Sequence, residues 1–244
     1  MALGRRKVSL SDPRRWVFNR MAAVYDARPP YPNELVEALA TRGPRVLELG
    51  AGIGHLAIPL AQRGCQVTAV EPAREMLSKL EQRAQGLSIL ALHAQAEALP
   101  VAGPFELALI ADALHFLDAE LTGHELARVQ AEVLAIVRVE PADTPYMNAL
   151  MALLHASAPR RLRATHGSAA QIAALAGRKL HGTQCFHDQH ALDRDALERL
   201  LSSISFVGPA MNPERRHALS REVEALGPAL YARMFTLELY THHG

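Results

Sequence analysis

The chain has 244 residues, with 26 Lys and Arg against 25 Asp and Glu, so its net charge of +1 provides no overall attraction for nucleic acid or an anionic membrane. Hydrophobic residues make up 49% and charged residues 21%, a balance that excludes a disordered chain. No apolar run reaches the roughly 18–20 residues of a membrane span, the first residues lack the apolar region of a secretory signal, and two cysteines cannot make a disulfide framework. We expect a cytoplasmic protein.

Residues 28–32 read Arg-Pro-Pro-Tyr-Pro. This segment cannot lie inside a helix or a central strand, because proline has a fixed φ and lacks an amide hydrogen. It is predicted to be a rigid connector. Asn33 is a suitable N-cap for a short helix that ends near residue 40.

From residue 45 the pattern alternates between short apolar runs and amphipathic stretches, which indicate strands and helices in turn. Strands are predicted over 45–49, 66–70, 87–92, 105–111 and 133–139. Helices are predicted over 54–62, 73–84 and 120–130. This alternation favours a doubly wound parallel sheet with right-handed crossovers.

After residue 140 the alternation stops. Helices are predicted over 145–157, 168–176, 194–203 and 213–226, and strands over 183–190 and 234–241. The simplest layout is a single α/β domain, residues 1–244, with a helical cap insertion at about 141–180.

The strongest chemical signal is a glycine-rich run over residues 46–56, because it follows a predicted strand and opens a predicted helix. Gly50 and Gly52 permit backbone conformations and a ligand approach that a Cβ would obstruct, and Gly54 lets the helix start close to the strand. A dinucleotide fingerprint needs glycine at the next position, where this chain has His55. No Gly-Lys-Ser/Thr sequence follows, so a triphosphate-binding loop is excluded.

Two acidic residues restrict the ligand further. Glu48, just before the turn, would repel a pyrophosphate but suits a ligand with an ammonium group. Glu71 stands 21 residues after Gly50, at the end of the next strand, where an acid can accept both ribose hydroxyls of an adenosine. S-adenosylmethionine combines adenosine and a cation without a pyrophosphate. It is therefore the expected cofactor, with S-adenosylhomocysteine as its product and no metal.

Several motifs now stand in one order and spacing. Glu-x-Gly-x-Gly-x-Gly at 48–54, Glu-Pro-Ala-Arg-Glu-Met at 71–76, Gln-Ala-Glu-Ala-Leu-Pro at 95–100 and the run over 105–116 resemble the class I S-adenosylmethionine-dependent methyltransferases. Residues 16–32 resemble the N-terminal cover of that family's small-molecule branch. The resemblance extends over about residues 15–140 and more loosely beyond.

The resemblance implies a Rossmann-like, mostly parallel seven-stranded sheet with an antiparallel last strand, an N-terminal cover over residues 1–40 and a helical cap. It implies that Glu71 holds the ribose, that Pro72 and Met76 pack against adenine, and that the segment starting at Gln95 reads the adenine edge. The full set of expected cofactor-binding residues is Tyr25, Glu48, Gly50, Gly52, Gly54, Glu71, Pro72, Met76, Gln95, Ala96, Glu97 and Asp112.

Four residues are candidates for roles in the reaction. His115, just past the fourth strand, is a candidate general base, or else it packs under the cofactor without touching the substrate. Asp112 orients it, bonds the cofactor's amino group or caps a helix. His187 and His190 point to opposite faces of a strand, which disfavours a metal pair and leaves contact with the substrate as their expected role.

The predicted insertion carries apolar residues at helical spacing, among them Tyr146, Met147 and Leu150, which are expected to line a substrate pocket. We expect methyl transfer to a small molecule, free or held by a carrier protein, at an oxygen atom. The alternatives are N- or C-methylation and a cofactor-binding protein without transfer activity. The chain lacks an Asn/Asp-Pro-Pro-Tyr motif and a basic appendage, so no nucleic-acid partner is expected. No membrane partner is expected either, and the protein is expected to be a monomer or homodimer.

Overall fold

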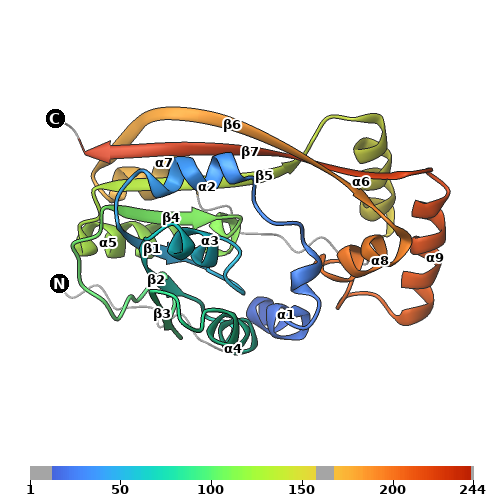
Figure 1. Ribbon diagram of the computed structural model, residues 1–244, viewed down its shortest axis with the longest axis horizontal. Coiled ribbons are helices and arrows are strands. Elements are labelled where there is room, and N and C mark those ends of the chain that lie inside the picture. Colours follow the sequence, from blue (N-terminus) through green and yellow to red (C-terminus); the bar gives the residue numbers. More distant parts are fainter. Residues whose placement is uncertain (1–12, 158–167, 243–244) are drawn as a thin grey trace.

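The structure is a computed structural model that describes residues 13–157 and 168–242 (Figure 1). Its seven-stranded sheet has the order β3-β2-β1-β4-β5-β7-β6. The strands are β1 Arg45–Leu49, β2 Gln66–Val70, β3 Ile89–Leu92, β4 Leu107–Ala111, β5 Val133–Pro141, β6 Arg178–Leu192 and β7 Ala229–His242. The first five pair in parallel, and β7 runs antiparallel to both of its neighbours. The predicted fold class is confirmed.

Helices cover both faces of the sheet. Those that pack on it or beside it are α1 Pro13–Met21, α2 Asn33–Ala40, α3 Ala57–Gln62, α4 Arg74–Arg83, α5 Ala119–Val129 and α7 Ala169–Leu175, with 3₁₀ turns at Tyr25–Ala27 (η1) and Leu114–Phe116 (η2). Alternate residues of each central strand point to opposite faces. In β4, Leu107 and Leu109 join the core under α2 and α3, whereas Ala108 and Ile110 join the core under α5 and α7.

A separate group of helices forms the cap: α6 Pro145–Ser157, α8 Arg194–Ser202 and α9 Pro213–Glu224. They share a hydrophobic cluster that includes Leu150, Leu154, Leu197 and Val223. Figure 1 shows β6 and β7 running from the sheet to this cap, beyond the end of β5. The cap therefore comes from two segments of the chain, one after β5 and one between β6 and β7.

The predicted cap insertion at 141–180 differs from this arrangement. Its first helix, α6, lies in the cap, but α7 packs against α5, where a Cβ on Gly123 would lie 2.5 Å from the Cβ of Leu175. The glycine that weakens the predicted helix thus allows two helices to approach closely. Part of the expected insertion, residues 158–167, lies outside the described residues.

The N-terminal cover sits on α4. Asn19 accepts a hydrogen bond from the backbone amide of Glu75 (3.0 Å), and Lys79 reaches both the carbonyl of Ala22 (3.0 Å) and the carboxylate of Asp26 (3.1 Å). These contacts hold η1 above the carboxyl ends of β1 and β2. Residues 1–12 of the expected cover lie outside the described residues.

Candidate active site

A cavity of about 280 Å³ lies between the carboxyl ends of the parallel strands, the N-terminal cover and the cap. Ligand sites of open α/β sheets lie at this edge. The expected cofactor-binding residues that line the cavity are Tyr25, Glu48, Gly50, Gly52, Glu71, Pro72, Met76, Ala96, Glu97 and Asp112. These residues come from five separate parts of the sequence, which the sheet topology brings to one edge.

The loop after β1 approaches the cavity with its backbone. Gly50 has φ +78°, and a Cβ there would lie 2.8 Å from the Cβ of Ala113. Gly52 has φ +57°, a conformation that non-glycine residues rarely adopt, although a Cβ there would meet nothing closer than Tyr25 Cε1 at 3.8 Å. Gly52 therefore leaves its surroundings open to a ligand, whereas Gly50 is needed for packing.

Glu71 fixes that loop from the end of β2. Its Oε2 accepts a hydrogen bond from the amide of Gly52 (2.8 Å), and its Oε1 accepts one from the amide of Ala73 (2.7 Å). Each carboxylate oxygen has more than one acceptor site, so two donors leave capacity for ribose hydroxyls. The geometry fits the expected role at the adenosine.

Glu48 is 3% exposed, and its Oε2 has no hydrogen-bond partner among the described residues. Burial, with a contribution from the nearby Glu71 carboxylate, raises the pKa of Glu48 to about 8. A buried oxygen without a partner costs free energy. A ligand ammonium group at this point would supply the missing hydrogen bond and favour the charged carboxylate.

The structure places Met76 and Glu97, two of the residues expected on the adenine side, at the cavity. Met76 is fully buried beside Ile53 and Ala73, and Glu97 accepts a hydrogen bond from the amide of Asp118 (3.1 Å). Gln95 does not line the cavity; its carbonyl instead accepts a hydrogen bond from the amide of Ala98 (3.1 Å) in a tight turn.

Gly54 also lies outside the cavity lining. It has φ +87°, and a Cβ there would collide with the buried side chain of Leu80 on α4. Its role in the structure is to let the start of α3 pack closely against α4. It shapes the loop without facing the ligand space.

Three side chains form a stack over the cavity. The rings of Tyr25 and His55 are stacked with centroids 5.7 Å apart and an interplanar angle of 17°, and the guanidinium of Arg28 lies 4.4 Å from the Tyr25 centroid. Burial lowers the pKa of His55 to about 4, with further lowering by Arg83 and Arg28. His55 is therefore neutral at physiological pH, and sequence reasoning used it only to exclude a dinucleotide.

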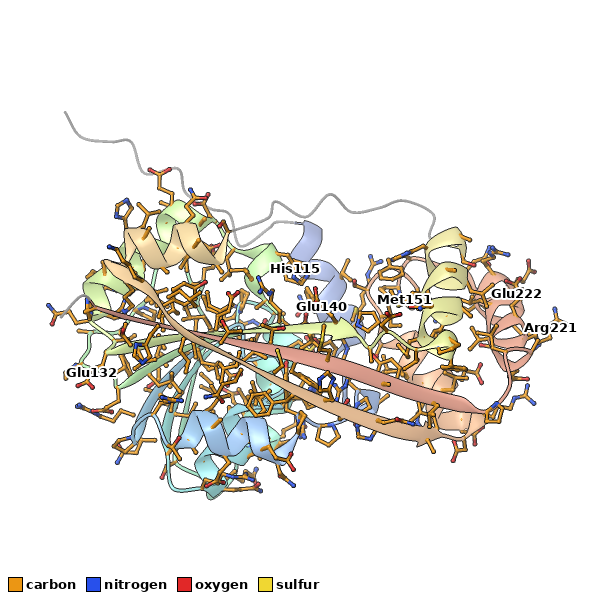
Figure 2. The ribbon with its side chains drawn as sticks, turned by 90° about the horizontal axis from the view of Figure 1, so that it is seen from above. His115, Glu132, Glu140, Met151, Arg221 and Glu222 are labelled. Atoms are coloured by element: carbon orange, nitrogen blue, oxygen red, sulfur yellow. The ribbon has the colours of Figure 1, made fainter. Side chains whose placement is uncertain are left out.

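Asp112 lines the cavity in a left-handed conformation (φ +48°), 3.4 Å from the Nη1 of Arg28. Burial raises its pKa, and Arg28 opposes that shift. His115 is not among the residues that line the cavity; its ring lies 3.9 Å from that of Phe116 on η2 (Figure 2). The structure thus places Asp112, and not His115, at the candidate site.

The expected substrate residues divide in the same way. Met147 and Leu150 line the cavity, whereas Tyr146 does not, and its buried hydroxyl has no partner among the described residues. His187 is exposed on β6. The ring Nε2 of His190 forms a hydrogen bond with Asp188 (3.1 Å). Asp188 in turn pairs with Arg233, which lines the cavity, whereas His190 does not.

The cavity residues that sequence reasoning did not assign to the site include Tyr31, His55, Glu140, Tyr231 and Arg233. The structure places Arg28 in the cavity as well. Arg28 and Tyr31 belong to the Arg-Pro-Pro-Tyr-Pro connector, and that rigid motif was the available signal. Tyr231 and Arg233 had none, because they lie in the first part of β7, before the predicted start of that strand.

Comparisons with known proteins agree with this geometry. Residues 46–138 match the sequence profile of the family described as "Methyltransferase domain". An uncharacterized methyltransferase of Mycobacterium tuberculosis is 38% identical over 132 residues, which cover 53% of this chain and 51% of that protein. The chain therefore spans about half the length of this curated relative.

Solved structures show a similar fold. A candidate type II methyltransferase from Anaeromyxobacter dehalogenans has a TM-score of 0.62 at 19% identity, covering 88% of this chain and 97% of that chain. A protein studied for the conversion of a disulfide bond into a thioacetal group during echinomycin biosynthesis has a TM-score of 0.57 at 18% identity, covering 92% of each chain. Residues 46–138 therefore resemble a methyltransferase domain, and the chain shares its fold with these solved structures.

Proposed function

We propose that this protein transfers a methyl group from S-adenosylmethionine to an oxygen atom of a small-molecule acceptor bound under the cap. The observation that carries the proposal is the pair of acids Glu48 and Glu71, which converge on one cavity at the β1 and β2 ends. Glu48 contributes a buried oxygen without a partner among the described residues.

The residues present fit the cofactor. Glu71 would accept hydrogen bonds from the ribose hydroxyls, and Glu48 would accept one from the ammonium group. Pro72, Met76 and Ala96 supply an apolar surface for the adenine ring. In the loop after β1, the amides of Gly50 and Gly52 already donate to the carbonyl of Val70 and to Glu71, so neither is available to a pyrophosphate.

When bound, the cofactor supplies an electrophilic methyl group: a bond forms between that carbon and the acceptor oxygen as the carbon–sulfur bond breaks, and the electron pair stays on sulfur. The protein's own task is to hold the acceptor in line and keep water out. Positioning alone can be worth up to roughly 7–11 kcal/mol in favourable cases. The apolar side chains of α6 that line the cavity would exclude water from it.

Asp112 supports an oxygen acceptor. It lines the cavity and carries a carboxylate that can take a proton from a hydroxyl, provided that the hydroxyl lies within hydrogen-bond reach. An acceptor that is already ionised would need no base.

The test is a transfer experiment with methyl-labelled S-adenosylmethionine and a small-molecule extract, followed by identification of the labelled products. Label in methyl esters or ethers supports the proposal. Label on nitrogen or carbon contradicts the choice of oxygen, and label on protein or RNA contradicts the small-molecule acceptor. Cofactor binding without any transfer would instead indicate a binding protein. Arg221→Gln, an exposed residue of α9, is the control.

A further inference from the structure

Two tyrosine hydroxyls of the cavity have no hydrogen-bond partner among the described residues. Tyr31 belongs to the connector and packs against Phe235 of β7, whereas Tyr231 lies near the start of β7 and packs against the cap cluster; both line the cavity. No described residue forms a hydrogen bond with either hydroxyl. Burial raises the pKa of both phenols, so both stay protonated at neutral pH and can donate. Both hydroxyls are therefore donors without a bonded acceptor among the described residues, although the carboxylate of Asp112 lines the same cavity and interacts electrostatically with both phenols.

Arg28 supplies a third set of donors at the same place. Its Nη1 makes one contact of 3.4 Å with Asp112, and its Nη2 donates to the carbonyl of Ser203 at the end of α8 (3.1 Å). A guanidinium has five N–H donors, so these two contacts leave most of its capacity unused. Tyr31 and Tyr231 both lie close enough to Arg28 to interact with it electrostatically.

Arg233 differs from Arg28 in this respect. It pairs with Asp188 through two nitrogens, and it donates to the carbonyls of Pro29 (3.1 Å) and Pro30 (2.6 Å). Its side chain is 7% exposed. Arg233 is therefore used to hold the connector against β7, and Arg28 remains the cation available to a ligand.

Beyond these donors, the cap side of the cavity is mostly apolar, and the carboxylates of Asp112 and Glu140 also line the cavity. The cap side includes Met151 and Leu154 of α6, Leu200 of α8, and Phe206 (Figure 2 marks Met151 on the cap). Burying apolar surface against such side chains contributes about 25 cal/mol per Å². A molecule that fits here has an oxygen-rich end at the three donors and an apolar body under the cap.

We propose that Arg28, Tyr31 and Tyr231 form a carboxylate subsite, and that the acceptor is an apolar molecule with a carboxylate group. A carboxylate has two oxygens that accept from a planar guanidinium fork and from phenol hydroxyls together. This inference rests on the proposed function, because it names the acceptor class of the same cavity. The carboxylate is an oxygen nucleophile that needs no base.

The test measures binding by calorimetry with the protein saturated with S-adenosylhomocysteine, so that the cofactor half of the site is filled. Octanoate is the probe, and octan-1-ol and octylammonium are matched probes that keep the apolar body. We expect octanoate to bind at least about tenfold more tightly than either. We expect Tyr31→Phe and Tyr231→Phe each to weaken octanoate binding by about threefold to tenfold, and Arg28→Gln by more than about tenfold.

The affinity for S-adenosylhomocysteine separates this inference from the proposed function. It should be unchanged in Tyr31→Phe, Tyr231→Phe and the control Arg221→Gln. The subsite is rejected if octan-1-ol binds as well as octanoate, if octanoate fails to bind, or if the tyrosine variants leave its binding intact. The subsite is also rejected if Arg28→Gln weakens the binding of S-adenosylhomocysteine but not that of octanoate, since Arg28 would then serve the cofactor. Arg28→Lys keeps the charge and should retain part of the octanoate affinity. If the wild type does not bind S-adenosylhomocysteine, the proposed function itself fails.

Discussion

Glu48 links the ligand site to the stability of the protein. Its pKa in the folded state, about 8, lies above the ordinary value of 4.5. Between these values the folded state binds more protons than the unfolded state, so this residue makes the free energy of unfolding fall as pH rises. The destabilisation is complete once pH passes the folded-state pKa.

Replacing Glu48 removes this dependence. From about pH 6.5 to about pH 8.5 we expect the ligand-free wild type to lose about 1–2 kcal/mol of stability relative to Glu48→Gln, as measured by urea unfolding. The range starts at the upper end of the pH interval, from about 4 to 6.5, in which the folded and unfolded states differ in the protonation of His55. Stability profiles of the two proteins that run parallel would contradict the assigned pKa. S-adenosylhomocysteine, which has the ammonium group, should bind the variant more weakly.

The positions of site residues were predictable where the expected chemistry requires one residue type at one place in the fold. Glu48 near the end of β1, the loop glycines Gly50 and Gly52, and Glu71 directly after β2 were expected to share one site, and all four line the cavity. The prediction for His115 rested only on its position just after β4 in the sequence. In the structure His115 lies in the turn η2, outside the cavity lining. His55 could not be recognised, because only its burial and its stack on Tyr25 give it significance.

At the scale of elements, the start of α3 depends on a glycine. Gly54 and Gly64 have nearly the same φ, +87° and +88°, but a Cβ at Gly54 meets Leu80 whereas a Cβ at Gly64 meets nothing within 4 Å. Both substitutions to alanine carry the cost of a left-handed residue, about 1–2 kcal/mol. Only Gly54→Ala adds the cost of overpacking, about 1–3 kcal/mol.

Urea unfolding of Gly54→Ala and Gly64→Ala checks this difference. We expect Gly54→Ala to be the less stable of the two by that overpacking cost. Equal stabilities would show that Leu80 yields without cost, and that backbone conformation alone accounts for the glycine at residue 54.

Two buried strands, β1 and β2, were predictable to the residue, but the outer strands β6 and β7 were not. β1 and β2 are short apolar runs closed by turn residues, and their predicted bounds match the structure. β6 and β7 were predicted over 183–190 and 234–241, and both are longer. Most of β6 is exposed at the edge of the sheet, so its ends show no apolar alternation; its length comes from pairing with β7 from Arg178 to Leu192.

Across the whole molecule, the cap is the feature that local sequence patterns cannot assign. α6 and α7 follow one another and both have apolar faces, yet one packs on α8 and α9 and the other on α5. Arg28 joins these parts, since it contacts Asp112 after β4 and the carbonyl of Ser203 after α8. The cavity between sheet and cap exists only because distant segments meet. None of the described helices is long and apolar enough to cross a membrane.

The most direct measurement of the central claim is the affinity for S-adenosylhomocysteine by calorimetry. We predict one bound molecule per chain, no binding of NAD, and a loss of at least about tenfold in Glu71→Ala, because two ribose hydrogen bonds disappear. Glu132→Ala, an exposed acid at the opposite end of β5 (Figure 2), should bind as the wild type does. Binding of NAD at this site, or an unchanged affinity in Glu71→Ala, would contradict the account.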